Sequence, residues 1–367
     1  MSEIASPPPA TDPAHRFVVV ADRIGATQHI SFAQPLAAAR AAGHAALTMA
    51  TDKKLGATPE VQADFWAKHR PTALFLSRYT GERAAALVAR ARAEGVPVIY
   101  HIDDDLLAPP ISLGPDKYAH YSDPARLAGL RATMELSDLI YASTTPLRDA
   151  LVGHGLSRPV VAGRVYCTLD TSLLPPPLPA TGPVIGYMGT EGHAEDLALV
   201  LPVIERLMDA MPELRFETFG TIAHPARLAR FTGRTAHHAP LGDYGLFLAR
   251  LASLGWWVGL APLQDGPFNR CKADTKWVEY GHAGMAVVAS AGPVYARACA
   301  DGAGLLAGDD ASWAAAIGAL LREAPARAEM LRRARDRLRA EYDHAALAAQ
   351  LFDVVAEARR VAAGANR

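Results

Sequence analysis

Short apolar segments alternate with amphipathic helical segments along most of the chain, and this alternation limits the possible folds more than any other feature. Runs such as 17–21 and 73–76 have the length of buried strands, and helical patterns follow them, as in 81–94. Strands joined by helices form parallel sheets with helices on both faces. The first half therefore predicts an α/β domain, with a further helix at 34–42 and further strands at 96–100, 139–142 and 160–162.

A proline-rich segment interrupts this pattern. Residues 173–183 contain five prolines, which exclude a continuous helix or a central strand, so we interpret them as a linker. The pattern then restarts, which predicts a second α/β domain. Its expected strands are 183–187, 214–219, 257–260 and 286–289, and its expected helices are 195–211, 244–253, 271–283, 312–323 and 325–363, the last with a break near Tyr342. The predicted fold class is α/β, with two Rossmann-like, doubly wound parallel-sheet domains.

Composition excludes several classes of protein. Lys and Arg number 37 and Asp and Glu 38, so the net charge of −1 lacks the basic excess of a nucleic-acid-binding protein. The three cysteines, Cys167, Cys271 and Cys299, are widely spaced, which argues against a disulfide framework or a cysteine zinc site. No signal-peptide pattern is present, and the apolar run 251–263 is shorter than the roughly 20 residues of a membrane span. We expect a cytoplasmic protein.

The loops that follow strands are the first places to look for a ligand site, because ligands of such sheets bind beyond the carboxyl ends of the strands. Gly189, Thr190, Gly192 and His193 follow the strand predicted at 183–187. Glycines allow a ligand to approach the backbone, and the N-terminus of the next helix can bind an anion. A purely structural turn would have the same pattern.

Two lysines form a second candidate site. Lys272 and Lys276 are two of only six lysines in a chain with 31 arginines, and Glu279 follows them at helical spacing. If 271–283 is one helix, all three side chains share a face. Two ammonium groups and a carboxylate suit a diphosphate and a ribose. The alternative is an exposed helix face with an internal Lys–Glu pair.

Three consecutive carboxylates, Asp103, Asp104 and Asp105, end the strand predicted at 96–100. They could hold a divalent metal, cap a helix that begins at Leu106, or place a base beside an acceptor hydroxyl. We choose Asp104 as the candidate base and expect no metal site.

Two further segments carry weaker signals. His237 and His238 could line a loop, although a solvated turn is the simpler interpretation. The basic stretch 322–339 could contact acidic lipid head groups. A solvated helix face with Glu329 and Asp336 between its arginines explains the same pattern.

Taken together, several motifs resemble bacterial glycosyltransferases of the GT-B class, in the group 1/family 4-like set. The resemblance rests on IGYMGTEGHAEDL (185–197), APL (261–263) and PFNRCKADTKWVEYGHAGMAVVAS (267–290), with IDDDL (102–106) and SDLIYAST (137–144) in the first half. It implies two domains that face each other across a cleft. Residues 16–175 would recognise the acceptor, 176–340 would bind a nucleotide-sugar donor, and 341–367 would form a helix that crosses back to the first domain. Independently of the resemblance, the proline- and alanine-rich residues 1–15 are expected to form a disordered tail.

The resemblance also implies residue roles. Glu279 would hold the ribose, while Lys272, Lys276, Asn269 and Arg270 would lie near the diphosphate and the sugar. Residues 240–244 would frame the base. The catalytic candidates are Lys272, His193 and Asp104, and the donor-binding candidates are Gly189, Thr190, Asn269, Arg270, Lys276 and Glu279. Many relatives carry two glutamates eight residues apart, and Cys271 occupies the first of these positions here.

The expected function is therefore the transfer of a hexosyl or related sugar from a nucleotide-sugar donor to an acceptor hydroxyl, in polysaccharide or glycoconjugate synthesis. The acceptor would be a carbohydrate or a lipid-linked intermediate, with weak peripheral membrane contact, and neither a cofactor nor a metal is expected. The alternatives are a nucleotide-sugar epimerase of the same fold and a non-catalytic nucleotide-sugar-binding protein. A receiver-like phosphoacceptor at Asp103–Asp105 is disfavoured by the chain length and by the second α/β half.

Overall fold

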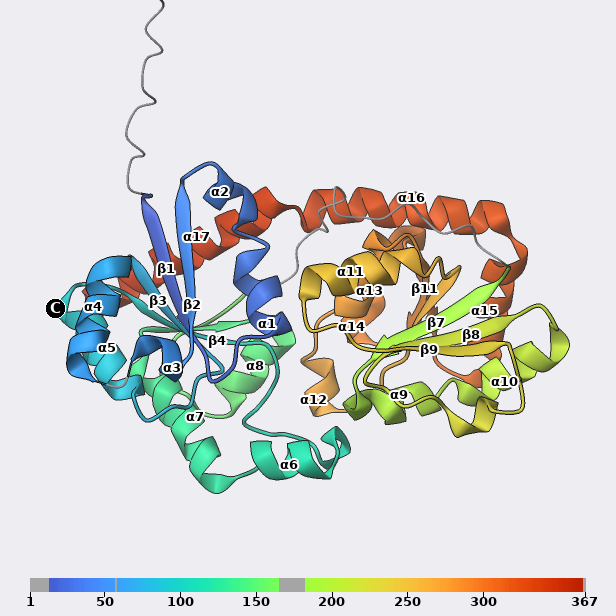
Figure 1. Cartoon of the computed structure of the whole chain (residues 1–367), viewed down its shortest axis with the longest axis horizontal. Helices are drawn as coiled ribbons and strands as arrows, with labels where there is room; N and C mark the ends of the chain where they lie inside the picture. Colours follow the sequence, from blue (N-terminus) through green and yellow to red (C-terminus); the bar gives the residue numbers. More distant parts are fainter. Residues whose placement is uncertain (1–12, 57, 165–181, 366–367) are drawn as a thin grey trace, which may run out of the picture.

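The computed structural model describes residues 13–56, 58–164 and 182–365. Two α/β domains lie side by side, and the helices α16 (Ala324–Glu341) and α17 (His344–Ala365) join them along one side (Figure 1). Each domain contains a parallel sheet of six strands. The expected fold class is thus confirmed. None of the described helices combines the length and the apolarity that a membrane crossing requires.

The first sheet has the strand order β2-β1-β3-β4-β5-β6. Its strands are β1 (His15–Val20), β2 (Ala45–Ala50), β3 (Ala73–Ser77), β4 (Val98–Ile102), β5 (Leu139–Ala142) and β6 (Val160–Ala162). Alternate residues of a strand face opposite sides of the sheet. Val18 and Val20 pack with one cluster of buried side chains, whereas Phe17 and Val19 pack with another. Both faces are therefore buried, as the continuous apolar runs predict.

Helices cover both faces of this sheet. The helical segments of the first domain are α1 (Ala26–Gln28), the π-helix η1 (His29–Ala33), α2 (Ala37–Ala41), α3 (Asp52–Leu55), α4 (Pro59–His69), α5 (Ala84–Ala93), the 3-10 helix η2 (Ile111–Leu113), α6 (Pro115–Tyr121), α7 (Pro124–Leu136) and α8 (Thr145–Gly153). Side-chain N-caps fix the starts of three of them, because Thr58 accepts from the backbone N–H of Val61, Asp123 from that of Arg126 and Thr144 from that of Leu147. The face that contains Phe17 is covered by α17, through Leu351 and Val355.

The second sheet has the order β12-β11-β10-β7-β8-β9. Its strands are β7 (Val184–Gly189), β8 (Arg215–Gly220), β9 (Thr235–His238), β10 (Val258–Ala261), β11 (Ala286–Ser290) and β12 (Leu305–Ala307). The helical segments around it are η4 (Glu191–His193), α9 (Ala194–Ala198), α10 (Leu201–Ala210), η5 (Ala226–Leu228), α11 (Tyr244–Ser253), α12 (Pro267–Arg270), α13 (Thr275–His282), α14 (Pro293–Ala296), η6 (Ala300–Gly302) and α15 (Asp310–Arg322).

Each domain inserts one apolar side chain into the core of the other. Ile30, from η1 of the first domain, packs in a buried cluster of the second domain. Cys271, from the second domain, is 4% exposed and belongs to the main buried cluster of the first. Beside it, the Thr144 hydroxyl donates to the Cys271 carbonyl oxygen at 2.8 Å. The two domains are thus in direct contact next to Lys272.

Several elements differ from the sequence prediction. The pattern did not predict the strands β2, β9 and β12 or the helices α1, α3, α4, α6, α7, α8, α12 and α14. The segment predicted as one helix at 195–211 is divided into α9 and α10, and the helix predicted at 271–283 begins only at Thr275. The expected break near Tyr342 separates α16 from α17. Most of the proline-rich linker, the 175/176 domain boundary and residues 1–12 of the tail lie outside the described residues.

Candidate active site

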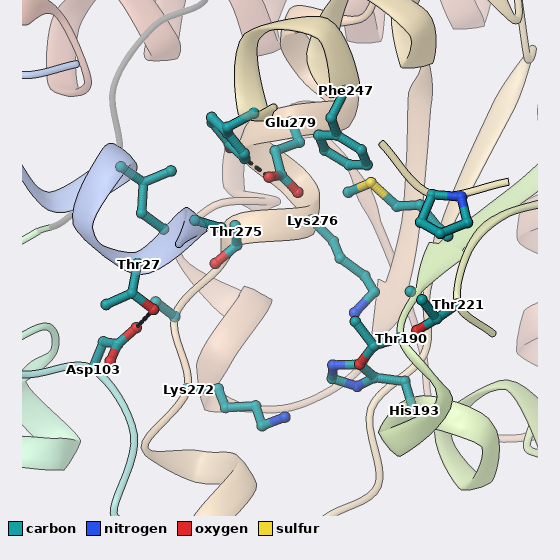
Figure 2. A pocket seen from close by; sticks show the side chains of 18 of the residues that line it. Thr27, Asp103, Thr190, His193, Thr221, Phe247, Lys272, Thr275, Lys276 and Glu279 are labelled. Carbon is teal, nitrogen blue, oxygen red and sulfur yellow. Dashed lines mark hydrogen bonds between the residues drawn. The ribbon is translucent and has the colours of Figure 1, made fainter. Parts of the chain in front are cut away.

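A cavity of about 450 Å³ lies between the carboxyl ends of the two sheets (Figure 2). Its volume is within the usual range for small-molecule sites, roughly 300–1,000 Å³. Residues from both domains line it. The first domain contributes Ala26, Thr27, Ile30, Arg78, Asp103 and Asp104, and the second contributes a larger set that includes Gly189, Thr190, His193, Thr221, Lys272, Lys276 and Glu279.

The ends of β7 and β8 form one wall of the cavity, where the backbone is tightly packed. Gly189 and Gly220 are register partners at these strand ends. Gly220 has φ +117°, and a Cβ there would lie 2.2 Å from the Gly189 carbonyl oxygen. Glycine is therefore required at position 220, because another side chain would separate the two strands. Gly189, Thr190 and Gly220 all line the cavity.

Lys272 and Lys276 both line the cavity, although they do not share a helix face. Asp274 is the N-cap residue of α13, so Lys272 lies in the turn before the helix. The expected single helix face is therefore wrong, but the turn brings the two lysines into one cavity. Figure 2 shows the Lys276 ammonium directed toward Thr190 and His193. Lys272 lies over the ring of Phe268, 5.4 Å from its centroid.

The charge state of Lys276 depends on its surroundings. Burial, and then the nearby Lys272, lower the pKa of Lys276 to about 8, against the opposing effects of Asp196 and Glu279. Lys276 is the second residue of α13, where backbone N–H groups have no partner within the helix. Ammonium groups and a helix N-terminus together provide a binding site for an anion.

Glu279 lies one turn further along α13 and is 8% exposed. The Tyr244 hydroxyl donates to its Oε1 at 2.5 Å. Burial raises the pKa of Glu279 to about 7, although the Tyr244 hydrogen bond and Lys276 both favour the ionised form. Ionised, this carboxylate can accept hydrogen bonds from two adjacent hydroxyl groups.

His193 is held by a carboxylate behind it. Its Nδ1 lies 2.8 Å from Asp196 Oδ2, and the backbone N–H of Gln264 donates to the other oxygen of Asp196 at 2.8 Å. Because an ionised carboxylate only accepts, Nδ1 carries the proton and Nε2 is left as an acceptor. The positive charge of Lys276, and then burial, lower the pKa of His193 to about 4, so the ring is neutral near pH 7.

The opposite end of the cavity is aromatic and apolar. Phe219 and Phe247 stack with ring centroids 5.0 Å apart, and Tyr244 stacks on Phe247 at 5.7 Å. Pro240 and Leu241 complete this end. A flat ring system fits such surroundings. Figure 2 shows Phe247 beside Glu279, with the ammonium groups of Lys276 and Lys272 below them in this view.

An ion-paired network forms the wall contributed by the first domain. Arg78 Nε donates to Asp103, and Arg78 Nη2 donates to Asp104 Oδ2 at 2.5 Å. Asp105 turns away from them and lies 2.9 Å from His154 Nε2. The helix-cap interpretation is wrong, because no helix begins at Leu106. Among the described residues, no group of three or more His, Cys, Asp or Glu side chains is arranged to hold a metal ion.

Of the predicted site residues, seven line the cavity: Lys272, His193, Asp104, Gly189, Thr190, Lys276 and Glu279. The other two, Asn269 and Arg270, lie outside it. Asn269 donates to the Gln264 carbonyl oxygen at 2.9 Å, and Arg270 forms a bidentate pair with Asp265. Sequence reasoning missed Thr27, Arg78, Phe219, Thr221 and Phe247.

The weaker signals also have structural explanations. His237 and His238 are the last two residues of the strand β9, so the solvated-turn interpretation is wrong. His238 Nε2 lies 2.8 Å from Glu217 Oε2, and His237 Nδ1 lies 3.0 Å from the Thr218 hydroxyl. On α16, Arg332 pairs with Glu329 and Asp336. This pairing fits a solvated helix face.

No protein-family model matches the sequence, and no curated protein matches it significantly. Solved structures do resemble the fold. HepE from Anabaena, in complex with UDP and glucose, aligns with a TM-score of 0.64 at 13% identity, over 94% of this chain and 100% of that one. A trehalose 6-phosphate synthase from Burkholderia multivorans aligns at 0.59 and 15% identity, over 96% and 98%. At such identities the likeness concerns the fold, which is the two-domain GT-B arrangement.

Proposed function

We propose that this protein is a glycosyltransferase that moves a sugar from a nucleotide-sugar donor to an acceptor hydroxyl. One observation carries the proposal: Lys276 and Glu279 project from a single helix into a cavity between two Rossmann-like domains. An ammonium group and a carboxylate, one helical turn apart, match the diphosphate and the ribose of one nucleotide.

The remaining walls support the same ligand. The diphosphate would lie at the N-terminus of α13, between Lys272 and Lys276, and the base would contact Phe247 and Leu241 at the aromatic end. The structures of HepE were solved with UDP and with UDP-glucose, so a uridine nucleotide is the first donor to test.

In the proposed reaction, the bond between the sugar C1 and the diphosphate oxygen breaks, and a bond from C1 to the acceptor oxygen forms. Negative charge develops on the leaving diphosphate, where Lys272 would stabilise it more than in the ground state. The neutral His193 ring would accept a hydrogen bond from a sugar hydroxyl through Nε2. The acceptor proton would pass to Asp104, which lines the cavity on the first-domain side.

We infer further that the reaction needs neither a metal nor a cofactor, because fixed cations and the N-terminus of α13 occupy the place where a metal would neutralise the diphosphate. The acceptor would be a hydroxyl of a carbohydrate or a lipid-linked intermediate. We place the enzyme in the cytoplasm, with any membrane contact peripheral.

Calorimetric titration with UDP, GDP, dTDP and ADP, followed by turnover of the matching nucleotide sugars, tests the proposal. We expect one nucleotide to bind, and an acceptor to accelerate its release from the donor. Epimerisation of the donor without an acceptor would identify an epimerase. Tight donor binding without turnover across a broad acceptor panel would identify a binding protein.

A further inference from the structure

The wall that the first domain contributes to the cavity carries more negative than positive charge. We propose that it binds an uncharged, hydroxyl-bearing sugar as acceptor and discriminates against phosphorylated or carboxylated acceptors. This inference rests on the proposed glycosyltransferase function, and it adds the chemical class of the acceptor.

The position of Arg78 is fixed by both its backbone and its side chain. It follows β3 with φ +52°, in the left-handed region, and its backbone N–H donates to the His101 carbonyl oxygen at 3.0 Å. Its guanidinium is shared by Asp103 and Asp104. Two carboxylates around one guanidinium leave a net charge of −1. Arg78 is therefore already paired and has no free charge to offer an anionic ligand.

The two carboxylates differ in what they can still bind. Asp103 accepts from Arg78 through Oδ1 and from the Thr27 hydroxyl through Oδ2, the latter at 2.9 Å. Asp104 pairs with Arg78 through Oδ2, and within the described part of the chain its Oδ1 has no partner. The side chain of Asp104 is also more exposed, at 28% against 13% for Asp103. Asp104 Oδ1 is thus the oxygen that is available to a ligand hydroxyl.

Apolar surface lies beside these carboxylates. Ala26 and Ile30 line the same side of the cavity as Thr27 and Asp103. A sugar ring presents both hydroxyl groups and C–H surface, and sites with mixed apolar and hydrogen-bonding walls complement both. A carboxylate oxygen can accept from a hydroxyl but repels a phosphate.

With the donor bound, no other cation among the described lining residues is free for an anionic acceptor. Of the described lining residues, only Arg78, Lys272 and Lys276 are lysine or arginine. The two lysines face the donor diphosphate, and Arg78 is paired. Lys117 approaches from the first domain, but it lies against the Gly192 backbone, outside this lining. A phosphate on the acceptor would therefore meet uncompensated carboxylate charge.

The test compares matched sugars on the full-length protein, with and without saturating UDP. Methyl glucoside, glucose 6-phosphate and glucuronate would be titrated and followed by ligand-observed saturation-transfer NMR. With UDP bound, so that its diphosphate occupies the two lysines, we expect methyl glucoside to bind at least tenfold more tightly than either anion. In Asp104→Asn, methyl glucoside should bind about tenfold more weakly, and the discrimination against the anions should shrink.

Asp265→Asn is the matched control. Asp265 also pairs with an arginine, Arg270, but this pair lies outside the cavity. Removing the charge of Asp265 should therefore leave the affinities for methyl glucoside and for the anionic sugars unchanged. Thermal unfolding and UDP titration of each variant show whether it is folded. If UDP fails to bind while the sugars still discriminate, the proposed donor fails and this inference survives.

Three results would overturn the inference: equal or tighter binding of an anionic sugar when UDP is bound, unchanged discrimination in Asp104→Asn under the same condition, or no binding of methyl glucoside with or without UDP.

Discussion

The hydroxyl of Tyr244 donates to Glu279 Oε1 at 2.5 Å, and this contact opposes the burial that raises the pKa of Glu279 to about 7. Only the ionised carboxylate accepts from both ribose hydroxyls, so the affinity for UDP should rise as the pH rises through 7. Between pH 7 and pH 6 the affinity should fall roughly fivefold. Above about pH 8 it should fall again, because Lys276 loses its proton. Calorimetric titration of UDP across this pH range measures both changes in affinity: the acid limb near pH 7 and the alkaline limb above about pH 8.

Three controls assign these limbs. Uridine has no diphosphate, so its affinity should show the acid limb alone. Glu279→Gln should abolish that limb, and Tyr244→Phe should move it to higher pH, since a hydrogen bond that favours the ionised form is lost. In the free protein, stability should decrease as the pH rises from the ordinary glutamate pKa of 4.5 toward 7, because the folded state holds the proton more tightly. A flat profile for UDP would contradict the assignment.

Glu279→Gln and Lys272→Ala should separate binding from catalysis. Loss of a charged hydrogen bond costs about 1.5–3 kcal/mol, so Glu279→Gln should weaken both UDP and the full donor by about ten- to a hundredfold. Lys272→Ala should reduce kcat more than it weakens donor binding, because its ammonium acts on charge that develops during bond breaking. Titration and steady-state kinetics measure both effects. If either variant bound the donor and turned it over like the parent protein, the donor site would lie elsewhere.

Asp196→Asn should lower turnover by about ten- to a hundredfold and leave UDP affinity nearly unchanged. Asparagine can donate to Nδ1 as well as accept from it, so the ring of His193 would no longer be held in one tautomer. Nitrogen chemical shifts of the His193 ring report the tautomer directly. The same change at Asp309, an N-cap of α15 outside the cavity lining, is the control. An unchanged tautomer together with reduced turnover would rule out this explanation.

Reaction with a thiol reagent should report the separation of the domains. Cys271 is 4% exposed in the core of the first domain, and burial, with Asp105 and Asp104, raises the pKa of its thiol to about 11. Labelling should therefore be slow and require opening, and UDP should slow it several-fold further. Peptide mass spectrometry follows Cys271, with the buried Cys299 as internal reference. Rapid labelling that UDP does not affect would contradict a closed contact.

Turnover should persist in excess EDTA, because in the proposed mechanism Lys272, Lys276 and the N-terminus of α13 would neutralise the diphosphate without a metal. Assays before and after chelation, with magnesium or manganese added back, measure this. Loss of activity that a metal restores would require the acidic residues 103–105 to be reinterpreted.

The local sequence pattern predicted strand positions accurately where a strand is buried on both faces. β3 and β5 read as short runs of large apolar residues, and both were predicted within a residue. β2 was missed because its sequence, AALTMA, is alanine-rich and only half-buried at the sheet edge. The start of α13 was misplaced because helical spacing from Lys272 continues across the N-cap at Asp274. Periodicity alone does not reveal such a boundary.

Site residues that lie close together in one segment could be predicted from the sequence. Site residues that only the fold brings together from distant segments could not. Lys272, Lys276 and Glu279 lie within eight consecutive residues that follow a strand, so strand-end reasoning could find them. The hydrogen bond between Thr27 and Asp103 joins residues 76 positions apart, and no local pattern marks either as a partner. Arg270 shows the reverse case. It belongs to the motif, but Asp265, five residues earlier, holds it away from the cavity.

The placement of α17 has a consequence for biosynthesis. The final helix of the chain covers the sheet face that contains Phe17, Val19 and Phe75, near the start of the chain. During translation, that face stays without this cover until the residues of α17 leave the ribosome. The domain that is made first is therefore completed only after the second, because burial of this one sheet face depends on prior synthesis of the second domain. The two domains share the same strand–helix plan, but only the second can bury its sheet without a segment that follows the other domain.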